Sequence, residues 1–123
     1  MRRQYKHGAV RRHKYGAEKT AVDGIQFASQ AEARKYAELR LLQRTGEVLE
    51  IELQPRFELQ PGFRHQGKWH RAITYTADFR VTYADGRVDV IDVKGVRTQQ
   101  YVLRKKMLLY RYPEMVFVEE AKH

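Results

Sequence analysis

Three charged side chains between residues 75 and 94 have the types and spacing of a site that acts on phosphate: Asp78, Asp92 and Lys94. They lie in two runs of alternating apolar and polar residues, joined at an Asp-Gly pair (85–86) of the kind that favours hairpin turns. Two carboxylates on adjacent strands repel each other, and a bound divalent cation removes that conflict. Carboxylate oxygens and water suit Mg²⁺ or Mn²⁺. The spacing therefore predicts a metal site, and the alternative is a solvated face of a strand.

The length of the turn decides whether the two aspartates meet. A two-residue loop would place Asp78 and Asp92 on opposite faces of the hairpin, because a shift of one residue moves every side chain to the other face. A three-residue loop over 84–86, with a left-handed glycine, places them opposite each other. We predict the three-residue loop, because it also opposes apolar residues, namely Phe79 with Ile91 and Ala77 with Val93.

A metal held by Asp78 and Asp92 gives the lysine a role. Magnesium bound in this way can activate water, polarise the phosphate and stabilise the leaving oxygen. Lys94 can then orient the attacking water or neutralise charge that develops on the phosphate. The carbonyl of Val93, between the two side chains, is a further candidate ligand.

The basic charge of the chain is concentrated at its N-terminus. Of the net charge of +9 over 123 residues, residues 1–19 carry +6, with seven Lys or Arg and one acid. Basic arms commonly bind the phosphate backbone of nucleic acids, and the alternative is a solubilising tail. We expect a flexible arm over residues 1–20 and one folded domain over 21–123. The arm residues predicted to contact nucleic acid are Arg2, Arg3, Lys6, Arg11, Arg12 and Lys14.

The elements that position these groups follow from periodicity and capping signals. Ser29-x-x-Glu32 is a capping box that opens a helix ending near Arg44. Alternation predicts strands over residues 47–59, 71–83 and 87–96, with a turn at 60–62 and a loop or irregular hairpin end at 63–70. A second helix over 98–110 and a strand over 115–118 complete the order. The prediction is an α/β fold with an αβββαβ core, a mixed sheet whose last strand is parallel to the third by a right-handed crossover.

The second predicted helix has an apolar side and a basic side. Its buried positions are expected to be Val102, Leu103, Met107, Leu109 and Tyr110. The exposed side carries three consecutive cations that we expect to hold the phosphate backbone, namely Arg104, Lys105 and Lys106.

The composition excludes several classes of protein. The chain has no cysteine, so a disulfide framework, a thiolate zinc site and a thiol nucleophile are impossible. No apolar run approaches the length of a membrane span, and the N-terminus lacks an apolar signal core. We therefore expect a soluble protein of the cytoplasm with no membrane partner.

The ordered segments resemble the PD-(D/E)XK nuclease superfamily, which has an αβββαβ core and includes restriction enzymes and junction-resolving endonucleases. More closely, the segments VDGIQFASQAEARKYAEL, ELQPRFEL, AITYTADF and IDVKG resemble a family of small phage and prophage endonuclease-like proteins. This resemblance covers about residues 20–113.

The resemblance implies roles for four residues. Asp78 matches the first metal-binding aspartate, and Asp92 and Lys94 match the (D/E)XK element. Glu32 matches a glutamate of the first helix that helps to hold metal in several of these nucleases, while the capping box explains it equally well. Two positions depart from the family pattern, because Ala77 stands where proline is usual and Asp92 where glutamate is commoner.

These observations together predict a Mg²⁺- or Mn²⁺-dependent DNA endonuclease. By analogy with the family, its substrate would be branched DNA such as a Holliday junction, in phage recombination or DNA processing within a bacterial host. A junction resolver needs two active sites, so we expect a homodimer. The alternatives are a non-catalytic DNA-binding module of the same fold and a nuclease that acts on single strands or RNA.

Overall fold

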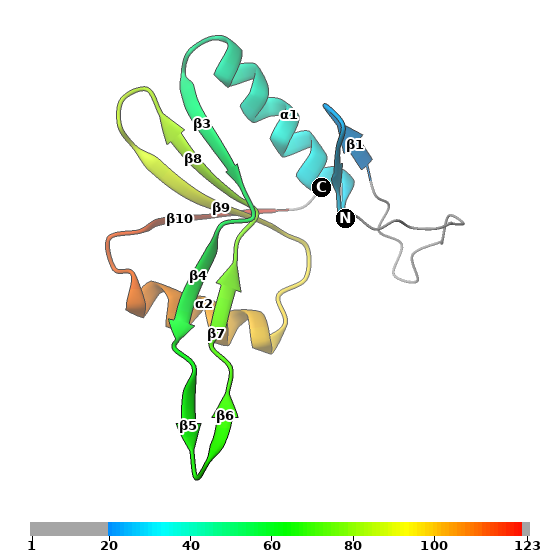
Figure 1. Ribbon diagram of the computed structural model, residues 1–123. Coiled ribbons are helices and arrows are strands. Elements are labelled where there is room, and N and C mark those ends of the chain that lie inside the picture. The colour runs from blue at the N-terminus through cyan, green and yellow to red at the C-terminus, as the bar shows by residue number, and fades with distance from the viewer. Residues whose placement is uncertain (1–19, 122–123) are drawn as a thin grey trace, which may run out of the picture. The chain divides into compact units, whose positions relative to one another are not determined.

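A computed structural model describes residues 20–121 of the chain (Figure 1). The chain separates into two compact units with the boundary between Ala37 and Glu38, so each unit is described by itself. The basic residues predicted to form the arm lie outside the described residues, namely Arg2, Arg3, Lys6, Arg11, Arg12 and Lys14.

The first unit begins with a short antiparallel pair, β1 (Thr20–Val22) and β2 (Ile25–Phe27). Both central residues of their turn have positive φ, +53° at Asp23 and +78° at Gly24, as an Asp-Gly hairpin turn requires. Helix α1 (Gln30–Arg44) follows. Its first turn is capped by Ser29, whose Oγ accepts the N–H of Glu32 at 3.2 Å, so the predicted N-terminal cap is confirmed.

The second unit contains a four-stranded mixed sheet in the order β10-β9-β8-β3 (Figure 1). Its strands are β3 (Val48–Leu53), β8 (Phe79–Tyr83), β9 (Val88–Lys94) and β10 (Val116–Ala121). The first three are antiparallel neighbours, and β10 returns parallel to β9 after helix α2 (Gln99–Arg111). The fold is therefore mixed α/β, and α1, β3, β8, β9, α2 and β10 give the expected αβββαβ order. Within residues 20–121, no helix is both long and apolar enough to cross a membrane.

One long, interrupted hairpin supplies two of these sheet strands. After β3 the chain continues through β4 (Arg56–Gln60) and β5 (Phe63–His65), turns at Gln66-Gly67, and returns through β6 (Lys68–His70) and β7 (Ile73–Thr76) to β8. The pairs β5–β6, β4–β7 and β3–β8 are all antiparallel. The predicted turn at 60–62 is wrong, because the chain there continues along the hairpin, and 63–70 forms a regular hairpin end.

Both arms of this hairpin are interrupted at the same level, next to Asp78. Gln54 has φ +50°, its N–H donates to the carbonyl of Asp78 at 2.9 Å, and the N–H of Ala77 donates to Pro55 at 3.0 Å. Ala77 packs in the cluster beneath α2, whereas Phe79 pairs with Ile91 and shares the opposite face of the sheet. The two predicted continuous strands, 47–59 and 71–83, are therefore each two strands that bury opposite faces.

Helix α2 packs on this unit through a different side from the one predicted. Tyr101 and Leu108 are buried, with Met107 and Tyr112 packed beside them. The predicted buried positions Val102, Leu103, Leu109 and Tyr110 are instead exposed by 40–88%. The buried side of α2 could not be predicted from apolar residues alone. The side that faces the sheet also carries Tyr101 and Lys105, whose polar atoms bind the charged side chain of Glu119.

The start of α2 depends on one side chain. Thr98 caps the helix, and its Oγ1 accepts the N–H of Tyr101 at 3.0 Å. We expect Thr98→Ala to lower the free energy of unfolding by about 1 kcal/mol, because this N–H loses its acceptor. Thr98→Asp keeps an oxygen acceptor and should unfold close to wild type. Urea denaturation followed by circular dichroism checks both variants, and an unchanged midpoint for the alanine variant would contradict the cap.

Candidate functional site

The hairpin between β8 and β9 has the register predicted from its apolar residues. Phe79 pairs with Ile91, and the loop contains three residues, because the N–H of Tyr83 donates to the carbonyl of Arg87 at 2.8 Å. Gly86 has φ +92°, the left-handed conformation that glycine adopts without strain. The three-residue loop is therefore confirmed.

Asp78 lies just beyond the regular ladder rather than inside it. Its N–H donates to the carbonyl of Ile91 at 3.1 Å, and Ile91 is also the partner of Phe79, so two residues of one strand oppose one residue of the other. Such a β-bulge bends the strand and redirects a side chain. The predicted pairing of Ala77 with Val93 is not formed, because the N–H of Ala77 bonds to Pro55 instead. The bulge therefore sets the direction of the Asp78 side chain beside β9.

The two aspartates are joined by reciprocal hydrogen bonds to the backbone. Oδ1 of Asp92 accepts the N–H of Asp78 at 2.9 Å, and Oδ2 of Asp78 accepts the N–H of Val93 at 2.8 Å. Each carboxylate is therefore held beside the strand that carries the other. The sequence prediction that Asp78 and Asp92 are brought together is confirmed.

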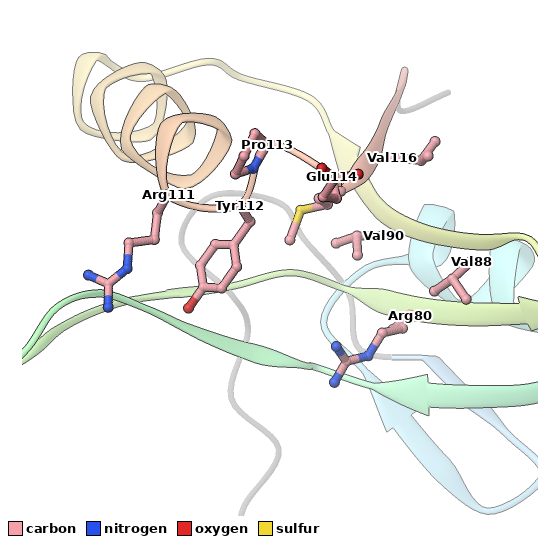
Figure 2. A pocket seen from close by; sticks show the side chains of 9 residues that line it. Arg80, Val88, Val90, Arg111, Tyr112, Pro113, Glu114 and Val116 are labelled. Atoms are coloured by element: carbon pink, nitrogen blue, oxygen red, sulfur yellow. The ribbon is translucent and has the colours of Figure 1, made fainter.

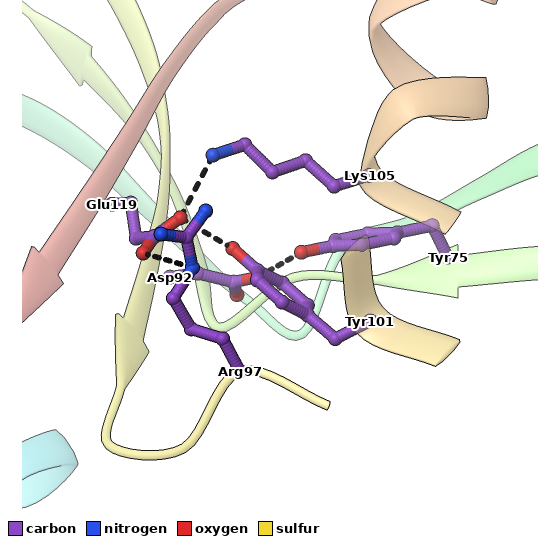
Figure 3. Close-up of polar contacts among 6 residues, drawn as sticks. All are labelled: Tyr75, Asp92, Arg97, Tyr101, Lys105 and Glu119. Atoms are coloured by element: carbon purple, nitrogen blue, oxygen red, sulfur yellow. Dashed lines mark hydrogen bonds and ion pairs between the residues drawn. The ribbon is translucent and has the colours of Figure 1, made fainter. Parts of the chain in front are cut away.

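Asp92 is buried, which excludes the solvated strand face as an explanation of this residue. Only 1% of it is exposed, and its Oδ2 accepts a hydrogen bond from the hydroxyl of Tyr75 (Figure 3). Burial raises the pKa of Asp92, because the charged form is desolvated, while the Tyr75 hydrogen bond and the charge of Lys94 act in the opposite direction. Burial also raises the pKa of Tyr75 above its usual range, and its contact with Asp92 adds to that effect. The phenol therefore acts as a donor.

Lys94 lies on the same side of β9 as Asp92. Its Nζ is 4.5 Å from the centre of the Tyr101 ring, and the side chain is half-buried. The ring fixes the ammonium group by a cation–π contact at a place where its charge stabilises ionised Asp92. The three residues predicted from the sequence therefore lie together where β8 begins and β9 ends.

A third acid, Glu119 of β10, extends this polar cluster. It is the register partner of Asp92, so the two side chains lie on the same face of neighbouring parallel strands. Glu119 accepts hydrogen bonds from Lys105 and Tyr101, both at 2.8 Å, and pairs with Arg97 at 3.2 Å (Figure 3). The Lys105 hydrogen bond is the main reason that the pKa of Glu119 lies below its usual range. Burial raises the pKa of Tyr101, and its hydrogen bond to Glu119 adds to that effect.

The remaining predicted site residues have different positions. Glu32 lies in the first turn of α1, in the first unit, so its part in a metal site stays a prediction. The Val93 N–H points toward Asp78, and because the N–H and C=O of one strand residue point the same way, its carbonyl also faces that side. Lys106 is exposed and Arg104 is half-buried, whereas Lys105 is bound to Glu119, so the prediction that Lys105 is freely exposed is wrong.

Sequence reasoning missed Tyr75, Tyr101 and Glu119. Tyr75 occupies an apolar position in the alternation of its strand, and nothing in the spacing marks its hydroxyl. Glu119 lies one residue beyond the predicted end of the last strand, which in fact runs to Ala121. A longer last strand, parallel to β9, would have placed an acid beside Asp92.

An open pocket of about 450 Å³ lies on the α2 side of the sheet, near the C-terminal end of the helix (Figure 2). None of Asp78, Asp92 and Lys94 lines it, and one of its two arginines, Arg80, is paired with Glu52 at 2.7 Å. The pocket therefore adds no group to the acidic site. Its lining residues are Arg80, Val88, Val90, Arg111, Tyr112, Pro113, Glu114, Met115 and Val116.

In the described part of the chain, no three His, Asp or Glu side chains are arranged to hold a metal by themselves. Two carboxylates, a lysine and a tyrosine hydroxyl make up the immediate site. A family model described as a protein of unknown function (DUF1064) matches residues 12–122. No curated protein and no protein of solved structure matches the chain.

Proposed function

This chain belongs to the DUF1064 family, and we propose that it is a magnesium-dependent DNA endonuclease that hydrolyses phosphodiester bonds. The observation that carries the proposal is the meeting of Asp78, buried Asp92 and Lys94 on two adjacent strands. Asp92 is buried with a raised pKa beside a second aspartate, and ionisable groups perturbed in this way cluster at functional sites. The αβββαβ order supports the same proposal, because it is the core order of the PD-(D/E)XK nucleases that the sequence resembles.

The donor set fits magnesium better than a metal that needs a complete protein cage. Magnesium keeps several waters and is commonly bound by one or two carboxylates together with substrate phosphates. Asp78 and Asp92 supply two such carboxylates, with the Val93 carbonyl as a further proposed ligand. A cation beside Asp92 would also offset the desolvation of its charge. When bound, the metal would supply activation of water and stabilisation of the negative phosphate.

The side chains around the aspartates have roles that follow from their contacts. Lys94 is positioned by the Tyr101 ring to orient the attacking water or to stabilise charge on the phosphate. Tyr75 holds one oxygen of Asp92 and so fixes its orientation. The network of Glu119, Lys105 and Arg97 fixes the neighbouring strand and the entry to α2. Arg104 and Lys106 contribute positive charge for the DNA backbone, together with the basic N-terminal residues.

The expected setting is the cytoplasm of a bacterial host cell, with branched DNA as substrate and a homodimer as the active species. The test is incubation of supercoiled plasmid and of a four-way junction with the protein, in Mg²⁺ and separately in EDTA. Cleavage in Mg²⁺ alone supports the proposal. Binding without cleavage in Mg²⁺ and Mn²⁺ would favour a non-catalytic DNA-binding module. Cleavage of RNA or single strands alone would show that the protein is a nuclease with one of these as its substrate.

We expect Tyr75→Phe to move the acid limb of the cleavage pH profile upward. The Tyr75 hydroxyl stabilises ionised Asp92, so its removal raises the pKa of this carboxyl further and a higher pH is needed to ionise it. Rates measured at saturating DNA across a pH series check the shift. Tyr110→Phe, which alters a tyrosine that is 88% exposed, is the control. A profile identical to wild type would contradict the positioning role of Tyr75.

A further inference from the structure

The end of the long hairpin is basic and aromatic, and it extends away from the sheet of its unit (Figure 1). This aromatic hairpin, residues 62–71, consists of β5, the Gln66-Gly67 turn and β6 with their flanks. No acid occurs between Glu58 and Asp78, a stretch that contains three cations and two histidines. A segment of one charge sign favours a polyanionic partner. The charged and titratable residues of the aromatic hairpin are Arg64, His65, Lys68, His70 and Arg71.

Trp69 is presented on one face of the aromatic hairpin rather than buried in a core. It is 54% exposed and pairs with Arg64, whose guanidinium lies 5.8 Å from the ring centre. Its ring extends over Gly62, where an added Cβ would lie 2.5 Å from Cζ2 and 2.8 Å from Cη2. Any side chain at position 62 would displace the ring. Because position 62 is glycine, the Trp69 ring can lie flat on the hairpin with much of its surface exposed to solvent.

The opposite face repeats the combination of an aromatic ring with basic groups. Phe63 is 41% exposed and stacks on His70, with ring centres 4.8 Å apart and planes inclined by 10°. Neither Phe63 nor Trp69 belongs to the apolar cluster beneath α2. Exposed aromatic rings among cations, without acids, are the pattern by which proteins hold unpaired nucleic-acid strands, with bases on the rings and phosphates on the cations.

We propose that the aromatic hairpin is a DNA-holding element, in which Trp69 stacks on an unpaired base and Arg64, Lys68 and Arg71 contact the adjoining phosphates. The proposal rests on the proposed DNA function but places a contact outside the acidic site. Ala77, which precedes Asp78, follows Trp69 by eight positions, so at about 3.3 Å per position the stacked base lies up to about 26 Å from the site. That span corresponds to roughly eight nucleotides at 3.4 Å each. Unpaired bases at this distance from a cut occur where a branched substrate carries a single-stranded flank.

The only tryptophan in the chain reports on this contact directly. We would titrate the full chain in EDTA, where proposed magnesium-dependent cleavage is absent, with a four-way junction that carries single-stranded flanks and with a single-stranded DNA of the same composition. Base stacking should quench the Trp69 fluorescence in both titrations. Heparin supplies the charge without bases and should quench little. Equal quenching by heparin, or quenching by an RNA strand and not by DNA, would overturn the proposal.

Substitutions then test whether the contact contributes affinity. Anisotropy of labelled DNA in EDTA should show binding weakened about tenfold or more by Trp69→Ala. Trp69→Phe should retain most of the affinity, and Gly62→Ala, which displaces the ring, should weaken binding. Arg44→Gln, at an exposed arginine outside the hairpin, should bind as wild type does. Unchanged binding by the Trp69→Ala variant would overturn the proposal.

The outcome is separable from that of the nuclease proposal. If wild type cleaves DNA but Trp69→Ala binds normally, the hairpin proposal fails alone. If wild type never cleaves DNA, but DNA still quenches Trp69 fluorescence and Trp69→Ala still weakens binding, the nuclease proposal fails alone. The protein would then be a DNA-binding module that uses the aromatic hairpin.

Discussion

Asp92→Asn is expected to lower magnesium-dependent cleavage by about 10³-fold and, at the same time, to make the folded protein more stable. The catalytic loss follows because asparagine keeps the shape of the side chain but not the charge that would hold the metal. Its oxygen can still accept the N–H of Asp78, and its amide can donate to Tyr75. The fold should therefore be preserved while the chemistry is removed.

The gain in stability follows from the direction of the Asp92 pKa shift. The folded-state pKa is raised, chiefly by burial, so the unfolded chain releases this proton at a lower pH than the folded protein does. As pH rises from about 4 through the folded-state pKa, the wild type loses stability at this position, and above that pKa the loss is complete. Asparagine does not ionise. The advantage of Asp92→Asn should thus be small near pH 4 and about 1 kcal/mol at neutral pH.

Urea denaturation of both proteins in EDTA at the two pH values measures this difference. Comparison of the two proteins at each pH cancels the titration of other groups such as Glu119. Glu50→Gln, which changes an exposed carboxylate on β3, should alter neither cleavage nor the pH dependence. A stability difference that stays constant between the two pH values would show that Asp92 is not a buried charge in the folded protein.

Lys94→Met is expected to lower the cleavage rate at saturating DNA by about 10²-fold, with a much smaller loss of DNA affinity. Methionine can keep the packing against the Tyr101 ring through a sulfur–aromatic contact, so the variant removes the ammonium charge and little else. The affinity changes little because one cation among many contributes to the backbone contacts.

Single-turnover cleavage of a labelled junction separates the rate from the affinity. Arg44→Met removes an exposed positive charge of similar size and should leave both quantities unchanged. Cleavage by Lys94→Met at the wild-type rate would end the proposed role of this lysine, whatever the result for Asp92.

The fold and half of the site could be predicted because local rules fixed them. The apolar pair Phe79–Ile91 selects the hairpin register, Thr98 and Ser29 mark helix starts, and the parallel return of β10 follows from the crossover. The hairpin register and the helix starts depend on neighbours in sequence, and the return of β10 follows from the handedness of crossovers. Asp78 and Asp92 were accordingly brought together by reasoning about a single turn.

The parts that could not be predicted depend on tertiary contacts. The interruption at Gln54 and Asp78 leaves the apolar alternation intact while it exchanges the buried face, so periodicity cannot reveal it. Tyr75 reaches Asp92 only because that exchange turns it toward α2. In α2, the apolar residues Leu103 and Tyr110 are exposed, while Lys105 turns inward to Glu119. Residue type is therefore a poor predictor of which side chains are buried when contacts with a charged cluster set the orientation of a helix.

The long interrupted hairpin has a consequence for the order of folding. The whole stretch from β3 to β8 can close outward from one two-residue turn at Gln66-Gly67, so each successive pair costs little loop-closure entropy. The adjacent β8–β9 turn is also local, and it brings Asp78 to Asp92. The docking of β10 after α2 is the late, non-local step, and it alone brings Glu119 to the cluster. We therefore expect the aspartate pair to assemble early and the Glu119–Tyr101–Lys105 network to close around it last.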